Sequence, residues 1–207
     1  VDNANLLDIA TAGTITASID TTEGVDELKT LTGTTHAYTI VIADGDATTT
    51  TAAELTTING KTTAAIDASA ITALASDTID NIKTLLTAGN DTEQFTAASF
   101  GSLTAVTVSD QTLDGSKLAA AIDEANSATD DTSVEFDISA ANTIEGSEAN
   151  FTALLTDDDN GQIDIDAQDI TVTGEISVDN ANLLDIATDG TITASIDTTE
   201  GVDELKT

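Results

Sequence analysis

Residues 1–30 read VDNANLLDIATAGTITASIDTTEGVDELKT, and residues 178–207 repeat them with one difference, Asp189 in place of Ala12. Chance does not produce 29 identities in 30 positions, so the chain contains a tandem duplication with a period of 177 residues. We interpret residues 1–177 as one full repeat and residues 178–207 as the start of the next, near-identical repeat. On this interpretation the chain is one period and the beginning of another, taken from a longer tandem array.

The same stretch shows a pattern that recurs in weaker form through the whole period. A short segment carries apolar residues three or four positions apart, such as Leu55 and Ile58 or Leu118 and Ile122, which is typical of one face of a helix. A glycine often follows, and then an alternating run such as TITASI at 14–19, which is typical of a strand. Most of these runs are closed by an acidic residue: Asp20, Asp44, Asp67, Asp110, Asp166 and Asp197.

Helix-then-strand units of roughly 24 to 31 residues are typical of solenoid proteins. The pattern therefore predicts an α/β solenoid with a short helix and a parallel β-strand in each coil, about six or seven coils per period, stacked into a rod. An all-β parallel solenoid is the alternative, because short helices rich in Ala and Thr are easily over-predicted. Thr51 and Glu54 fit a capping box and predict the start of one helix.

Composition excludes several classes of function. The 38 Asp and Glu residues against five Lys and Arg give a formal charge of −33, which opposes binding to nucleic-acid phosphates. The absence of Cys excludes disulfides and thiolate metal sites, and a single histidine excludes His-rich metal centres. No apolar run of about 18 residues predicts a membrane span. His36 and Tyr38 have no nucleophile pattern around them, so we predict structural roles for both and no enzyme activity.

Acidic clusters are the best candidates for a binding site, because Ca²⁺ takes oxygen ligands and would offset repulsion between carboxylates. The strongest cluster is DDDNGQIDID at 157–166, although it does not fit an EF-hand, since Thr156 and Ala167 would fill the first and last ligand positions. Asp130 and Asp131 form a further candidate cluster. The alternative is a solvated acidic surface. The predicted calcium ligands are Asp157, Asp158, Asp159, Asn160, Asp164, Asp166, Asp44, Asp46, Asp110 and Asp114.

Three stretches resemble the repeats of a known class of protein: TLTGTTHAYTIVIAD at 30–44, LTTINGKTTAAIDASAITAL at 55–74 and NLLDIATAGTITASID at 5–20. They are similar to repeats of giant cell-surface proteins of marine bacteria and cyanobacteria, of the swimming-motility surface protein type and the RTX-like adhesins. The resemblance implies secretion, an extracellular or cell-surface location, association with calcium and no enzyme activity. The RTX nonapeptide Gly-Gly-x-Gly-x-Asp is absent, so the calcium-roll mechanism of that group is not implied.

These observations predict a structural repeat unit of a giant secreted surface protein, which forms an extended shaft or an extracellular filament and can be adhesive. The expected partners are adjacent copies of the same repeat and, laterally, other copies of the chain, with no nucleic acid and no membrane insertion. The alternative is a ligand-binding solenoid for a polysaccharide or an ice surface. Thr-x-Thr patterns at 14–16, 171–173 and 191–193 could match an ice lattice, but Thr also favours exposed strand positions and the pattern fails at 64–66 and 134–136. An aromatic content of 2% offers few platforms for sugars.

Overall fold

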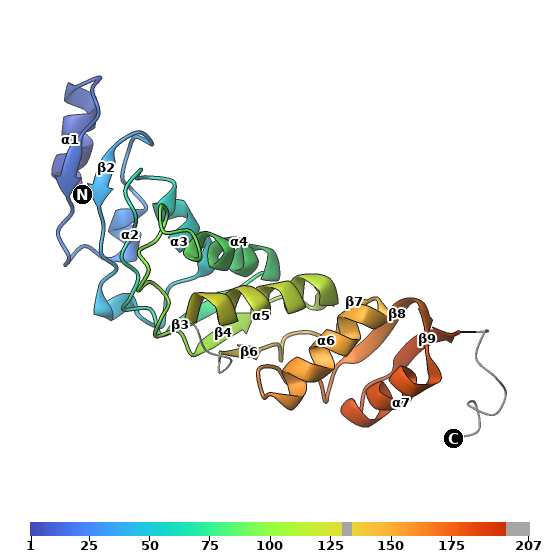
Figure 1. The fold of residues 1–207 in the computed structure, drawn as a ribbon. Helices are drawn as coiled ribbons and strands as arrows, with labels where there is room; N and C mark the ends of the chain where they lie inside the picture. The colour runs from blue at the N-terminus through green and yellow to red at the C-terminus, as the bar shows by residue number, and fades with distance from the viewer. Residues whose placement is uncertain (130–133, 198–207) are drawn as a thin grey trace.

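The computed structural model describes residues 1–129 and 134–197 as an α/β fold in which helices and short strands alternate (Figure 1). The helices are α1 (Asp2–Ala10), α2 (Val25–Leu28), α3 (Ala52–Asn59), α4 (Ile79–Gly89), α5 (Gly115–Thr129), α6 (Glu148–Asp159) and α7 (Val178–Ala187), with a short 3-10 helix η1 (Asp44–Asp46). The strands are β1 (Thr16–Ser18), β2 (Ala37–Thr39), β3 (Ala73–Asp77), β4 (Ala105–Val108), β5 (Thr112–Asp114), β6 (Glu135–Asp137), β7 (Thr143–Gly146), β8 (Asp169–Ile176) and β9 (Ile192–Ile196).

The strands form three separate parallel sheets. The first pairs β1 with β2, the second has the order β3-β4-β6, and the third has the order β5-β7-β8-β9. The second and third sheets are interleaved along the chain, because β5 lies between β4 and β6 in the sequence and pairs elsewhere. The predicted α/β solenoid, with one strand per coil in a continuous stack, is therefore wrong. The described chain is instead a single small α/β domain that is not closed into a solenoid.

The reason for this difference lies in turns inside the extended runs. The segments 105–114 and 135–146 each break into two strands, one before and one after a turn, and the two strands join different sheets. Alternation of apolar and polar residues does not report such a change of sheet, because it continues on both sides of the turn. The all-β alternative is also wrong, since seven α-helices lie in the described residues.

The core is aliphatic and continuous between the helices and the sheets. From α2 to α7 each helix packs against the next one in the sequence, and Figure 1 shows them advancing from one end of an elongated body to the other. The largest fully buried side chains include Tyr38 and the four phenylalanines, of which Phe95 and Phe100 have ring centroids 5.2 Å apart. No helix within 1–129 or 134–197 combines the length and the apolar character that crossing a membrane requires.

Several local predictions are confirmed. Thr51 and Glu54 form the predicted capping box, since the Thr51 hydroxyl accepts the Glu54 N–H (3.2 Å) and Glu54 accepts the Thr51 N–H (3.0 Å). Leu55 and Ile58 are buried in α3, as the helical spacing predicted. The alternating run at 14–19 contains β1, although the strand itself is shorter than the run.

The two copies of the repeated sequence form the same succession of a helix and a strand where both are described, with bounds that differ by one residue. Residues 178–187, which form α7, correspond to residues 1–10, of which α1 covers Asp2–Ala10. The residues that follow the helices, Thr11 and Thr188, are both extended, with φ of −137° and −134°. Both copies then form a strand, β1 or β9. Residues 198–207 lie outside the described part, and the division into a full repeat and the start of a second stays a prediction.

Candidate functional site

Carboxylates lie at the N-terminal ends of α2, α3 and α4, and each one comes from a segment 21 to 31 residues further along the chain. A helix N-terminus has N–H groups without partners inside the helix and a partial positive charge, so a carboxylate there is favourable on both counts. These bonds tie neighbouring segments together. They run from the Val25 N–H to Asp46 Oδ2 (3.1 Å), from the Ala53 N–H to Asp77 Oδ2 (2.7 Å) and from the Ile79 N–H to Asp110 Oδ2 (2.7 Å).

Glu148 makes a related connection between α6 and α7. Its Oε1 accepts the Ser177 hydroxyl (2.6 Å), the Ser177 N–H (3.0 Å) and the Asn180 side-chain amide (2.7 Å). These bonds, the one from the Ser177 hydroxyl first, hold the pKa of Glu148 below its ordinary value. The carboxylate of one helix therefore joins the N-terminal end of the next.

Another set of carboxylates closes tight turns within a segment. Each accepts the backbone N–H of the residue two positions later, at 2.9–3.0 Å, which is a common way for Asp to stabilise a turn. The bonds from Thr22 lower the pKa of Asp20, and those from Ser139 lower the pKa of Asp137. The full set is Asp20 with Thr22, Asp67 with Ser69, Asp91 with Glu93, Asp114 with Ser116, Asp137 with Ser139 and Asp164 with Asp166.

The structure places the predicted calcium ligands in three separate regions. Asp157, Asp158 and Asp159 end α6, Asn160 caps it, and Asp164 and Asp166 follow in the loop before β8. Asp44 and Asp46 lie in η1, and Asp110 precedes β5, which ends at Asp114. Within the described residues, no three His, Cys, Asp or Glu side chains are grouped as metal ligands would be. Asp130 and Asp131 lie outside the described residues. Calcium binding therefore stays a prediction, based on charge and on loop composition.

The loop after α6 shows how its carboxylates are used. Gly161 turns the chain with a φ of +74°, and Asp158 Oδ1 accepts the Ile165 N–H (3.2 Å) across the loop. Burial, with a smaller contribution from the charge of Asp123, raises the pKa of the half-buried Asp157 to about 6. The carboxyl therefore holds its proton to a higher pH than an exposed Asp does, and a cation bound beside it would lower its pKa.

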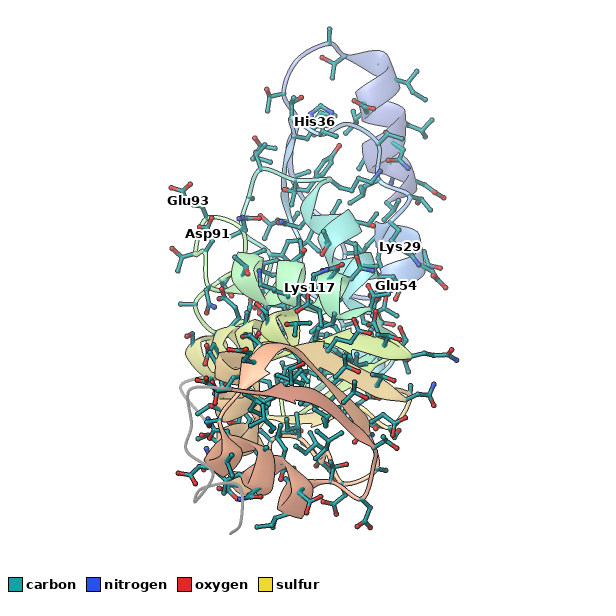
Figure 2. The ribbon with its side chains drawn as sticks, turned by 90° about the vertical axis from the view of Figure 1, so that its right-hand side faces the viewer. Lys29, His36, Glu54, Asp91, Glu93 and Lys117 are labelled. Carbon is teal, nitrogen blue, oxygen red and sulfur yellow. The ribbon has the colours of Figure 1, made fainter. Side chains whose placement is uncertain are left out.

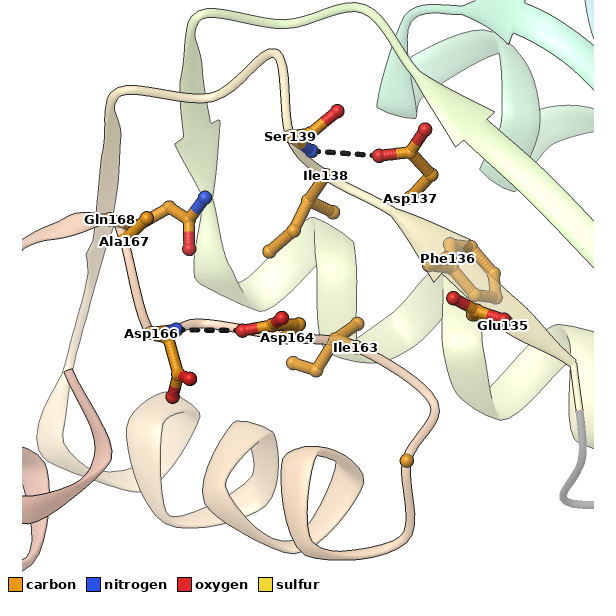
Figure 3. Close-up of a pocket in the computed structure, with 11 residues that line it drawn as sticks. Glu135, Phe136, Asp137, Ile138, Ser139, Ile163, Asp164, Asp166, Ala167 and Gln168 are labelled. Carbon is orange, nitrogen blue, oxygen red and sulfur yellow. Dashed lines mark hydrogen bonds between the residues drawn. The ribbon is translucent and has the colours of Figure 1, made fainter.

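An open groove of ≈ 470 Å³ lies beside this loop, and Figure 3 shows its lining. The carboxylates of Asp137 and Asp164 are directed to the backbone N–H groups of Ser139 and Asp166, as the dashed lines mark. Phe136 is 1% exposed, so its ring offers no surface on which a sugar could lie. Among the described residues, the lining of the groove consists of acidic, amide, hydroxyl and apolar groups and has no basic side chain. Its one hydroxyl beside a carboxylate is that of Ser139, whose bonds to Asp137 lower the pKa of that carboxyl and close a turn.

Lysines connect neighbouring helices in two places. The ammonium group of Lys29, just after α2, lies 2.6 Å from Glu54 of α3 and 2.8 Å from Asp26 (Figure 2). Both contacts raise the pKa of Lys29, and the contact with Asp26 contributes most. Lys117 of α5 lies 2.8 Å from Asp80 of α4. In a chain with so few cations, these lysines serve the contacts between adjacent helices.

His36 is buried, at 4% exposure, and both of its ring nitrogens are engaged. Nδ1 accepts the Ile15 N–H (3.1 Å), so the proton lies on Nε2, which donates to Asp8 Oδ1 at 2.6 Å. This bond lowers the pKa of Asp8. The arrangement joins α1 to the chain before β2, near one end of the body (Figure 2), and leaves the imidazole no free nitrogen for acid–base chemistry.

Comparison of the chain with protein-family models, with curated proteins and with solved structures finds no match to any of the three. The arrangement of carboxylates therefore has to be interpreted from its own geometry. Sequence reasoning missed the helix-capping role of Asp77 and the pairing of Asp8 with His36. A local signal existed for the turn residues, since Asp followed two positions later by Ser or Thr is the pattern of an Asp-stabilised turn.

Proposed function

We propose that the chain is a structural repeat unit of a giant secreted surface protein, located outside the cell or on its surface, where it forms part of an extended shaft or filament. One observation carries the proposal. The same 30-residue sequence begins with a helix and a strand at both ends of an elongated body, as α1–β1 and as α7–β9 (Figure 1). A unit whose two ends carry the same element can be joined to further copies end to end.

The use of the charged side chains supports a structural role without enzyme activity. Carboxylates accept backbone N–H groups at helix ends and in turns, and lysines join adjacent helices. The remaining acidic surface keeps a repetitive extracellular chain soluble and attracts cations, which fits an association with calcium.

The alternative of a ligand-binding surface receives less support. An ice-binding face would need a regular row of threonines across neighbouring strands. In the four-stranded sheet the row that contains Thr171 and Thr193 continues through Glu145 and Asp114. Two carboxylates in the row break the match to a lattice of hydroxyl and methyl groups, and we therefore favour the structural role.

Immunogold electron microscopy of cells that carry the protein tests this proposal. An antibody raised against residues 1–207 is expected to label extended structures on the cell surface, and adsorption of the antibody with the purified chain should remove the label. Label confined to the cell interior would overturn the proposal.

A further inference from the structure

The two copies of the repeated sequence bury different faces of the same helix. In α7 the side chain of Leu184 is 0% exposed, whereas its equivalent in α1, Leu7, is 51% exposed. Thr188, just after α7, is buried, and its equivalent Thr11 is exposed. Because the two sequences are nearly identical, the difference in exposure is due to the parts of the chain that each copy packs against.

In the second copy, α6 and β8 cover this face. α6 packs against α7, and β8 pairs with β9. The Thr188 hydroxyl donates to the backbone carbonyls of Gln168 (2.8 Å) and Asp166 (3.1 Å), and Asn180 donates to Glu148 of α6 (2.7 Å). The second copy of the repeated sequence therefore packs on a surface formed by α6 and β8.

In the first copy, the opposite side of α1 is the one in use. The Asn5 side chain donates to the Thr30 carbonyl (3.0 Å) and accepts the Thr32 N–H (2.9 Å), and Asp8 pairs with His36. In the described residues β1 pairs with β2 alone, so its other edge is open. We define the Leu7 face as the exposed residues Asn3, Leu7, Ala10 and Thr11 together with this open edge of β1.

We propose that the Leu7 face docks on the α6–β8 surface of a second copy of the repeat 1–177, with the contacts that α7 and β9 make within one chain. The inference rests on the proposed structural function and deepens it by naming the partner and the two surfaces. Each residue of the Leu7 face has an equivalent in α7–β9 that is more buried: Asn180, Leu184, Ala187 and Thr188. The interface is heterologous, joining one end of a copy to the other end of the next, so it can continue into a filament.

Within one chain, α7 and β9 already occupy the α6–β8 surface. A covalently linked segment has an effective concentration in the millimolar range, so a second copy at micromolar concentration does not displace it. We therefore expect the unchanged chain to be monomeric at micromolar concentration. Weakening the contact of α7 with α6 should release the surface and promote association.

Sedimentation velocity on the full chain tests this expectation. Leu184→Asp places a charge in the contact between α6 and α7 and should lower the concentration for half association by about 10- to 100-fold relative to the unchanged chain. Adding Leu7→Asp should abolish the association. Adding Thr57→Asp instead should not, because Thr57 is exposed on α3 and lies outside the Leu7 face. Association of the double variant with Leu7→Asp, or a folded Leu184→Asp variant that stays monomeric at millimolar concentration, would overturn the proposal.

A cross-linking trap keeps the test decisive if Leu184→Asp does not fold. Leu155 of α6 and Leu183 of α7 line the same groove, and Leu6 is the equivalent of Leu183. The chain has no cysteine, so Leu155→Cys in one chain and Leu6→Cys in another can be joined by a short bismaleimide. We expect mixed dimers to accumulate irreversibly in the otherwise unchanged background and to be lost when Leu7→Asp is added. A yield equal to that with Thr57→Cys, an exposed position on α3, would refute the inference. This result is independent of where the protein lies in the cell, so it can fail while the proposed location holds.

Discussion

Asp110→Ala removes the carboxylate that accepts the Ile79 N–H at 2.7 Å and leaves the first turn of α4 with one more unsatisfied donor. Side-chain capping is worth about 0.5–2 kcal/mol, and the interaction of a carboxylate with the helix dipole adds about 0.3–1 kcal/mol. We therefore expect the free energy of unfolding to fall by about 1–2 kcal/mol, and the melting temperature by about 3–6 °C for a chain of this length. Circular dichroism during urea and thermal unfolding measures both quantities.

Asp80→Ala is the matched control, because Asp80 lies in the first turn of the same helix and its exposed carboxylate pairs with Lys117 at the surface. An exposed pair of this kind contributes little, so the control should lose no more than about 0.5 kcal/mol. The effect of Asp110→Ala should be the same with calcium and with a chelator. A loss of stability that is present only in calcium would identify Asp110 as a metal ligand and refute the capping role.

Four further outcomes are expected. Leu184→Ala should cost about 2–3 kcal/mol in urea unfolding and Leu7→Ala less than about 1 kcal/mol, because only the former is buried; equal losses would contradict the packing of α7 on α6. Asp157→Asn should stabilise the chain by about 1 kcal/mol at pH 7.5 and change its stability little at pH 4. Because the folded pKa of Asp157 is about 6, ionising this carboxyl costs stability as the pH rises through 6, and Asn avoids that cost. A gain in stability at pH 4 would exclude this cause. Calcium should raise the melting temperature more than sodium chloride of equal ionic strength, and identical curves would mean that the carboxylates only solvate the surface. Replacing Asp158, Asn160 and Asp164 together by Ala should reduce the calcium effect, and an unchanged effect would exclude the loop at 157–166.

The helices and the capping box could be predicted because their signals are local. Apolar spacing places Leu55 and Ile58 on one face of α3, and a hydroxyl three residues before a glutamate defines the start of that helix. The strand β1 likewise lies inside the alternating run at 14–19. These signals depend only on residues a few positions away, so they do not change with the arrangement of the rest of the chain.

The division into three sheets could not be predicted, because it depends on pairing between residues 20 to 32 positions apart. Nothing local to β5 indicates that it joins β7 and not β4. The roles of the carboxylates at the helix ends could not be predicted either, because each one bonds to a residue far away in the sequence. The sequence around Asp110 contains no sign that the Ile79 N–H lies beside it. From the sequence, the closing acidic residues were expected to repel one another, and calcium was expected to offset that repulsion. The structure instead directs the carboxylates of Asp20, Asp67 and Asp110 to backbone N–H groups.

The central claim, that the repeat builds an extended shaft, is tested most directly by small-angle X-ray scattering on two chains. One is the present chain, and the other carries a second copy of residues 1–177 before it. A compact particle grows with about the 0.38 power of its length, so its radius of gyration would rise by about 1.3-fold. The account predicts a rise nearly in proportion to chain length, about 1.8-fold, because copies joined end to end extend along one direction. A ratio near 1.3 would show that consecutive repeats collapse onto one another, and it would contradict the shaft.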